Sequence, residues 1–182
     1  MPDVQTVHFS RIESPVGPLL LAATDRGLRY LWFDRGKLPR PLPGEVWIES
    51  AAALRMYQEQ LSAYFRGELH AFTCKLDLQG TSFQKKCWTA LQRIPYGTTC
   101  SYAELAKRVG SPRAFRAVGQ ANHNNPVAII VPCHRVIGAN GSLTGYGGGM
   151  EIKEKLLRLE GAPLQGALTF APICEARSKA GL

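Results

Sequence analysis

The sequence has no long hydrophobic run: among its 182 residues, no stretch reaches the roughly 20 apolar residues that a membrane-spanning helix requires. Residues 1–4 lack the basic segment followed by an apolar segment that is typical of a secretory signal peptide. We therefore expect neither a membrane span nor an export signal, which favours the cytoplasm as the location of the protein.

Cysteine is rare, and its spacing argues against two classes of small secreted or metal-binding domain. The chain has five cysteines, an odd number, and no C-x-x-C motif. This pattern fits neither a disulfide framework nor a zinc knuckle, and it favours reduced thiols in the cytosol. The five are Cys74, Cys87, Cys100, Cys133 and Cys174.

Acidic residues are scarce in the second part of the chain. Residues 1–80 carry nine Lys or Arg and nine Asp or Glu, whereas residues 81–182 carry thirteen and five. The whole net charge of +8 therefore lies in the second part. A basic surface of this kind attracts polyanions, of which nucleic acid is the simplest. A solubilising surface is the alternative, and composition alone does not decide between them.

The densest group of reactive side chains lies in residues 129–138, I-I-V-P-C-H-R-V-I-G. The apolar run before Pro132 predicts a strand that ends there, because proline cannot donate a hydrogen bond to a neighbouring strand. Cys133, His134 and Arg135 follow directly. A thiol beside an imidazole is a candidate activated nucleophile, since the thiolate is the reactive form. The alternative is a structural cysteine beside a hydrogen-bonded histidine.

Residues 1–80 predict a small three-stranded sheet with one helix. Apolar or alternating segments at 7–12, 19–23 and 28–33 are separated by turn signals. A helix is predicted over residues 50–66 from five apolar residues at helical spacing. They are Leu54, Tyr57, Leu61, Tyr64 and Phe65. This part of the chain contains no recognisable catalytic set.

Residues 81–161 predict a mainly helical domain that contains a helix-turn-helix. Ser101 and Glu104 form a capping-box pattern that opens one short helix, and Ser111–Pro112 predicts the start of a second. The second helix would place Arg113, Arg116 and Gln120 outward, and Phe115, Val118 and Ala121 inward. Such a pair, basic on its outer face, is typical of DNA-binding proteins. A solvated helix pair in a bundle is the alternative.

Two features follow the reactive stretch. Asn140–Gly141, between short apolar segments, predicts a hairpin next to Cys133. Residues 145–149, G-Y-G-G-G, allow the backbone to approach a ligand closely and supply one aromatic ring for stacking.

The predicted strands and helices together indicate the α+β fold class. We expect a sheet-plus-helix domain at 1–80, a helical domain at 81–161 and a tail at 162–182.

The motif Pro132–Val136 resembles the active-site signature of the O6-alkylguanine-DNA alkyltransferases, also called methylated-DNA–protein-cysteine methyltransferases, in their free-standing bacterial form. The match covers residues 81–161 strongly and the N-terminal part weakly. Further segments fall in family order: Phe83-Gln84, Trp88, Ile94–Gly97, Ser101-Tyr102, Arg116–Gly119, Asn125-Pro126, Gly145-Tyr146 and Glu160-Gly161.

The resemblance implies irreversible, single-turnover repair of double-stranded DNA by a monomer that needs no cofactor. The damaged guanine would rotate out of the base stack, and its O6-alkyl group would move to the thiolate of Cys133. O4-alkylthymine is a further possible substrate. His134 and Glu160 would activate the thiol, and Asn125 would support them. Because neighbours on an extended chain point to opposite faces, we expect a bridging water between thiol and imidazole.

The resemblance also implies which residues contact the substrate. Arg116 would enter the duplex from the minor groove in place of the flipped base, and Tyr102 would press the adjacent phosphate. Val136, Tyr146, Gly147 and Gly148 would wall the alkylguanine pocket. The residues expected at the DNA are Ser101, Tyr102, Arg113, Arg116, Ala117, Gly119 and Gln120.

Departures from the family pattern and two other functions complete the expectations. Gly147 stands where some relatives have serine, so a side-chain contact with the substrate is lost. Some relatives bind zinc in the N-terminal part. Here no cysteine precedes Cys74, and only His8 and His70 are available there as ligands, so we predict no metal. The alternatives are a lesion-binding alkyltransferase-like protein that does not repair, and a cysteine hydrolase.

Overall fold

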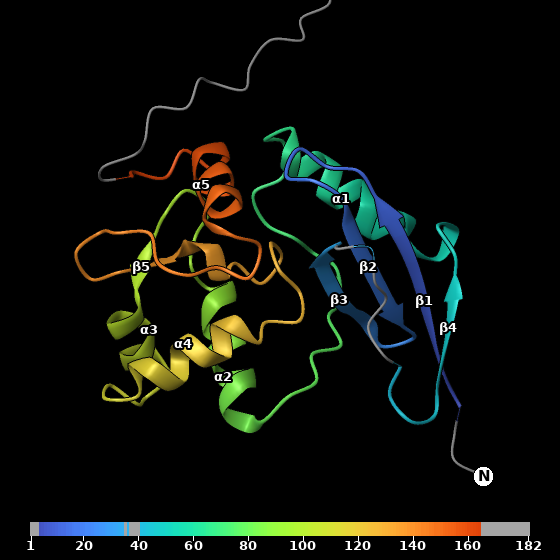
Figure 1. Ribbon diagram of the computed structural model, residues 1–182, viewed down its shortest axis with the longest axis horizontal. Coiled ribbons are helices and arrows are strands. Elements are labelled where there is room, and N and C mark those ends of the chain that lie inside the picture. Colours follow the sequence, from blue (N-terminus) through green and yellow to red (C-terminus); the bar gives the residue numbers. More distant parts are fainter. Residues whose placement is uncertain (1–3, 35, 37–40, 165–182) are drawn as a thin grey trace, which may run out of the picture.

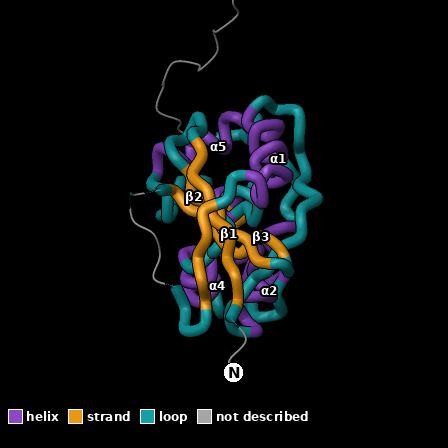
Figure 2. Tube along the Cα trace, turned by 90° about the vertical axis from the view of Figure 1, so that its right-hand side faces the viewer, coloured by secondary structure: helices purple, strands orange, loops and turns teal. Residues whose placement is uncertain are grey.

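The computed structural model describes residues 4–34, 36 and 41–164. A sheet with helix α1 forms one side of the molecule, and the remaining helices form the other (Figure 1). Viewed from the sheet side, β1, β2 and β3 cross the front, and α2 and α4 lie behind them (Figure 2). The elements are β1 (Gln5–Ile12), β2 (Leu19–Thr24), β3 (Gly27–Phe33), β4 (Glu45–Glu49), η1 (Ala52–Leu54), α1 (Arg55–Phe65), α2 (Ser82–Gln92), β5 (Cys100–Ser101), α3 (Tyr102–Arg108), α4 (Phe115–His123), η2 (Cys133–Arg135), β6 (Val136–Ile137) and α5 (Met150–Leu159).

The N-terminal sheet has four strands, in the order β3-β2-β1-β4, where the sequence predicted three. Strands β1, β2 and β3 form an antiparallel meander, and β4 adds to β1 in parallel. Strand β4 has only five residues, and Val46 and Ile48 remain about half exposed at the sheet edge. Its sequence therefore carries a weak strand signal, and pairing with β1 is what makes it a strand.

One hydrophobic core joins the two sides. It includes Leu21 and Leu31 of the sheet, Leu61 of α1, Trp88 of α2 and Val131 beside Cys133. Every residue of β2 is buried, so this strand packs against neighbours on both faces. The reactive segment is thus anchored between the sheet and the helices.

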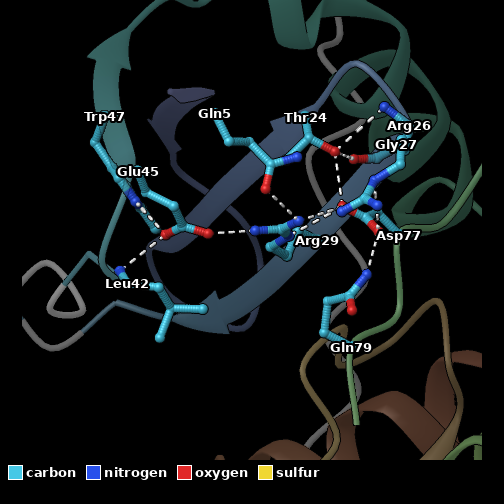
Figure 3. Close-up of polar contacts among 10 residues, drawn as sticks. All are labelled: Gln5, Thr24, Arg26, Gly27, Arg29, Leu42, Glu45, Trp47, Asp77 and Gln79. Atoms are coloured by element: carbon cyan, nitrogen blue, oxygen red, sulfur yellow. Dashed lines mark hydrogen bonds and ion pairs between the residues drawn. The ribbon is translucent and has the colours of Figure 1, made fainter. Parts of the chain in front are cut away.

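A buried ion cluster, here called the Arg29 cluster, lies at the end of the sheet where β1 begins and β2 ends (Figure 3). Its members are Gln5, Thr24, Arg29, Glu45 and Asp77. The guanidinium of Arg29, 3% exposed, donates to Asp77 Oδ2 at 2.7 Å, to Gln5 Oε1 at 3.0 Å and to Glu45. The cluster connects β1, β3, β4 and the segment that leads to α2.

The capping box predicted at Ser101 is confirmed, and the structure has a second one at Thr81. The Thr81 side chain accepts from the Gln84 N–H at the start of α2, and Ser101 pairs in the same way with Glu104 at the start of α3. The second helix of the predicted pair begins later than expected: α4 starts at Phe115, and residues 112–113 form a turn. Helices α3 and α4 pack against each other.

The inward position predicted for Phe115 is wrong, because this side chain is 49% exposed. It lies in the first turn of α4, where no element covers it, whereas Val118 and Ala121 are buried as predicted. The later start of the helix removes Phe115 from the packed part of the stripe.

The strand predicted before Pro132 is a succession of buried turns instead. The Val131 N–H donates to Val127 O at 3.0 Å, and Ile129 adopts a φ of +72°. A single bridge joins Val127 to Leu31 of β3. Burial alone demands apolar residues, so periodicity could not distinguish a strand from a buried turn here.

The predicted hairpin at Asn140–Gly141 is also wrong. Strand β6 pairs in parallel with β5, through Cys100 opposite Val136, and the Asn-Gly residues form a turn closed by the Gly138 N–H and Ser142 O at 2.8 Å. The turn at Asn140–Gly141 is present as predicted, but the strand that pairs with β6 is β5, which directly precedes α3. None of the described helices combines the length and apolar character needed to cross a bilayer.

Candidate active site

A cavity of about 220 Å³ opens beside Cys133. Its walls come from the end of β3, the end of α4, the segment around Cys133 and the glycine-rich loop. They comprise Trp32, Phe33, Asn122, His123, Asn125, Ala128, Cys133, Tyr146, Gly147 and Gly148. A larger hollow of about 480 Å³ near β1 contains no thiol among its lining residues, so the smaller cavity is the one that can hold a substrate for Cys133.

The thiol of Cys133 is held by an amide that is itself fixed. Asn125 Nδ2 donates to Cys133 Sγ at 3.1 Å and to Val131 O at 2.7 Å. Its Oδ1 accepts from the Val127 N–H at 3.0 Å. Both ends of the amide are engaged, so its orientation is set and its N–H₂ group points at the sulfur.

Burial raises the pKa of the Cys133 thiol, while the Asn125 hydrogen bond, the Lys153 charge and nearby backbone N–H groups oppose that rise. Cys133 is 7% exposed, so solvent does little to stabilise a thiolate. At rest the group is a thiol. A base must remove its proton when the substrate is in place.

His134 supplies such a base. Its Nε2 lies 2.8 Å from Glu160 Oε1, and a carboxylate can only accept, so Nε2 carries the proton. Burial lowers the pKa of His134, which keeps the imidazole neutral. Its Nδ1 has no hydrogen-bond partner among the described residues and presents a lone pair.

Glu160 is the centre of a second buried ion cluster, here called the Glu160 cluster, formed by Tyr64, Gly97, His134, Arg135 and Glu160. Tyr64 OH donates to Oε1 at 2.7 Å, and Arg135 Nε donates to Oε2 at 2.8 Å. The Gly97 N–H donates to Oε2 at 3.3 Å. Burial works against ionisation, but the hydrogen bonds from His134 and Arg135 prevail and lower the pKa of Glu160 to about 2.

Lys153 is a further buried charge next to the thiol. Its Nζ donates to Val136 O at 2.6 Å and to Thr144 O at 2.9 Å, so it ties α5 to β6 and to the segment before the glycine-rich loop. Burial lowers the pKa of Lys153 to about 8, and the thiolate form of Cys133 opposes that shift. No sequence pattern singled out this residue.

Comparison with known proteins decides the family. A model described as "6-O-methylguanine DNA methyltransferase, ribonuclease-like domain" matches residues 7–78, and one described as the DNA binding domain of the same protein matches residues 82–162. The chain belongs to the 6-O-methylguanine DNA methyltransferase family. It is thus an enzyme of direct-reversal DNA repair that transfers a methyl group to a protein cysteine, and neither the non-repairing lesion binder nor the hydrolase is favoured.

Relatives cover almost the whole described chain. The methylated-DNA–protein-cysteine methyltransferase of Methanosarcina acetivorans is 54% identical over 156 residues, which is 86% of this chain and 99% of the relative. That of Mycobacterium tuberculosis H37Rv is 49% identical over 165 residues, 90% and 98% of the two chains. A crystal structure of the M. tuberculosis protein in complex with DNA has a TM-score of 0.78, 51% identity, and coverage of 86% and 95%.

The structure of this methyltransferase brings most of the predicted catalytic and pocket residues together. Asn125, Cys133, Tyr146, Gly147 and Gly148 line the cavity, and His134, the residue after Cys133, is buried with its Nε2 on Glu160. Two predicted pocket residues do not line it. Val136 is fully buried in the core, and Tyr102 lies against Gly119 with its hydroxyl accepting from Thr144 Oγ1 at 3.3 Å.

The predicted DNA-contacting residues lie on or beside α4. Arg113, Arg116, Ala117 and Gln120 are exposed. Gly119 is half-buried, and Ser101 is engaged in its capping box. The guanidinium of Arg116 lies 5.9 Å from the centre of the exposed Phe115 ring.

Several site residues were missed by sequence reasoning. Phe33 and Trp32 of the N-terminal sheet wall the cavity, and the Phe33 ring packs edge-on against Tyr146 at 5.7 Å. A Cβ at Gly148 would lie 2.6 Å from that ring, so any side chain there would have to displace the ring or the loop. Tyr64 and Asn122 were also missed. No local motif marks these residues, because distant parts of the chain bring them to the site.

Proposed function

We propose that Cys133 is the acceptor of the alkyl group and that the substrate is O6-alkylguanine in double-stranded DNA. The observation that carries this proposal is a thiol in the cavity wall, followed in the chain by a buried neutral imidazole that is hydrogen-bonded to an ionised carboxylate. This is the arrangement by which a buried thiol is converted to a nucleophile on demand.

In the proposed reaction His134 Nδ1 takes the thiol proton through a bridging water, and Glu160 stabilises the imidazolium that forms. The sulfur then attacks the alkyl carbon, so that the S–C bond forms while the C–O6 bond breaks. The guanine leaves with its electron pair and receives a proton at N1, so the overall proton balance closes. Since a thioether is not readily cleaved, the reaction is a single turnover that needs no cofactor.

The second part of the proposal concerns the approach to DNA. Helices α3 and α4 would act as the helix-turn-helix, and Arg116 would fill the gap left by the flipped base. The small residues Ala117 and Gly119 allow the backbone of α4 to come close to the minor groove. In support, Arg113, Arg116 and Gln120 are exposed on this side, and a relative has been crystallised with DNA.

The division of labour between the two sides completes the proposal. Residues 1–80 would support the site and supply Phe33, while residues 81–161 would carry the chemistry, in a monomeric cytoplasmic protein. The predicted tail 162–182, with Cys174, lies outside the described residues from 165 onward.

The test is the intact mass of the protein after incubation with a duplex that contains one O6-methylguanine. We expect the stoichiometric gain of one methyl group in place of a hydrogen, mapped to Cys133 and absent from Cys133→Ala. Binding without an adduct would instead indicate a lesion-binding protein.

A further inference from the structure

Tyr64 is the member of the Glu160 cluster that comes from the N-terminal part of the chain. It lies near the end of α1 and is fully buried, and its hydroxyl donates to Glu160 Oε1 at 2.7 Å across 96 residues. The ring packs against Phe65, Phe72 and Tyr96, with 5.3 to 6.0 Å between ring centres. A tightly packed ring therefore holds the hydroxyl on the carboxylate.

The two oxygens of Glu160 have different neighbours. Oε2 accepts from Arg135 Nε at 2.8 Å and from the Gly97 N–H at 3.3 Å. Oε1 accepts from Arg135 Nη2 at 3.0 Å, from His134 Nε2 at 2.8 Å and from the Tyr64 hydroxyl at 2.7 Å. The two-point contact with Arg135 already fixes the plane of the carboxylate. The distinct contribution of Tyr64 is that it shares with His134 the oxygen to which the imidazole is bonded.

This sharing limits the effect of Glu160 on the imidazole. A hydrogen bond to an ionised carboxylate withdraws negative charge from the accepting oxygen, and the same charge stabilises an imidazolium. Without the Tyr64 bond, Glu160 would hold a proton on His134 more strongly. A protonated imidazole cannot accept the proton of the Cys133 thiol, so a base that is too strong would lower the reactive fraction of the protein at neutral pH.

Several other charged and titratable groups also face this pair. Burial lowers the pKa of His134, the Glu160 hydrogen bond raises it, and the positive charges nearby lower it further. Burial and the Glu160 charge raise the pKa of Tyr64 far above its ordinary value, so it stays a neutral donor. Its hydroxyl can therefore be removed without changing the net charge of the cluster. The groups that face His134 or Glu160 are Tyr64, Tyr96, Cys133, Arg135, Tyr146 and Lys153.

We propose that Tyr64 is a positioning residue for the proton path: through its bond to Glu160 Oε1 it limits how strongly the carboxylate holds a proton on His134, and it so keeps the imidazole free to accept the thiol proton. The inference rests on the proposed function, in which His134 takes that proton. It gives the N-terminal part of the chain a share in the chemistry, because α1 lies outside the segment that carries the thiol, the imidazole and the carboxylate.

The experiment compares the pH dependence of the single-turnover transfer rate in the wild type and in Tyr64→Phe, from about pH 5 to about pH 8, on an O6-methylguanine duplex. The rate should fall in acid as His134 takes up a proton. In Tyr64→Phe this fall should begin at a higher pH, by roughly half a unit to one unit. The variant should then be about three- to tenfold slower at the acid end. Where the imidazole is neutral in both proteins, the two rates should agree within about twofold.

Two further measurements separate this role from packing. Tyr57→Phe is the matched control, because it removes a hydroxyl from the same helix outside the Glu160 cluster, and its rate profile should coincide with that of the wild type. NMR titration of the His134 ring without DNA should show a higher pKa in Tyr64→Phe than in the wild type. Tyr64→Phe keeps the packed ring, and all rates are taken below the unfolding transition at each pH.

A tyrosine with a merely structural role would lower the Tm of Tyr64→Phe and leave the acid fall and the His134 titration in place. That result, or a shift of either to lower pH, would overturn the inference. Uniform slowing at every pH would overturn it as well, because it would show that the hydroxyl does not act on the protonation of His134. Failure of the wild type itself to form an adduct would refute the proposed function instead.

Discussion

The Arg29 cluster and the Glu160 cluster are built alike but differ in what they leave open. Each buries a guanidinium against a carboxylate with further donors around it. In the Arg29 cluster each guanidinium nitrogen of Arg29 has a partner within the cluster. In the Glu160 cluster one member, His134, keeps a nitrogen without a partner among the described residues, and it is next in the chain to a thiol in a cavity wall. A buried ion cluster of this kind can support chemistry only where one member keeps a lone pair or a proton available to a substrate or to the reacting group.

The largest expected effect comes from neutralising the Glu160 carboxylate, with Asp77 of the Arg29 cluster as the control. Glu160→Gln should slow methyl transfer roughly 10²- to 10⁴-fold, because the imidazolium formed by proton transfer loses its counter-charge. Asp77→Asn should leave the transfer rate of the folded protein unchanged. Single-turnover rates on an O6-methylguanine duplex, normalised to folded protein, measure both. Similar losses in the two variants would erase the proposed distinction between the clusters.

The second comparison replaces the two buried guanidinium groups. Arg29→Met and Arg135→Met each leave a buried carboxylate without its partner, so each should lower the free energy of unfolding by about 3 to 5 kcal/mol. Only Arg135→Met should also slow transfer, because its loss raises the pKa of Glu160. Urea unfolding and transfer rates below the unfolding transition separate the two effects. A transfer defect in Arg29→Met would show that the sheet end is coupled to the site.

Acid stability provides a third, smaller effect. The pKa of Glu160 is about 2 against an ordinary 4.5, so the folded state gains stability above pH 4.5 and loses it as the pH falls toward 2. The contribution is on the order of 3 kcal/mol. Unfolding free energies measured from pH 5 to pH 2 should decline less steeply for Glu160→Gln than for the wild type. Parallel curves would contradict the depressed pKa.

Lys153 should give the last effect, in the alkaline range and with the same direction of pH dependence as Glu160. Its folded-state pKa of about 8 lies below its ordinary 10.5, so between these values the unfolded chain binds more protons than the folded protein. Stability should therefore rise with pH across this window in the wild type. Lys153→Met should remove that rise, with the wild type at the same ionic strength as its control. A rise that persists in the variant would have to come from other groups.

The sequence by itself determined the features that depend on near neighbours. Adjacent residues or composition give the Cys133–His134 pair, the capping boxes at Thr81 and Ser101, and the basic C-terminal part. A capping box needs only hydrogen bonds within one turn, so it fixes the start of a helix locally. The α+β class followed because the sheet and the longer helices have clear periodicity.

Only the tertiary structure decided the rest. Tyr64 reaches Glu160 across 96 residues, β4 becomes a strand through β1, and Phe33 closes the cavity from the sheet. The buried turns before Cys133 satisfied the same apolar pattern that had predicted a strand. The physical reason is that an apolar pattern indicates that a segment is buried but not which segment packs against it. Packing of the core decides which distant groups meet, and it leaves the amide of Asn122 without a partner among the described residues.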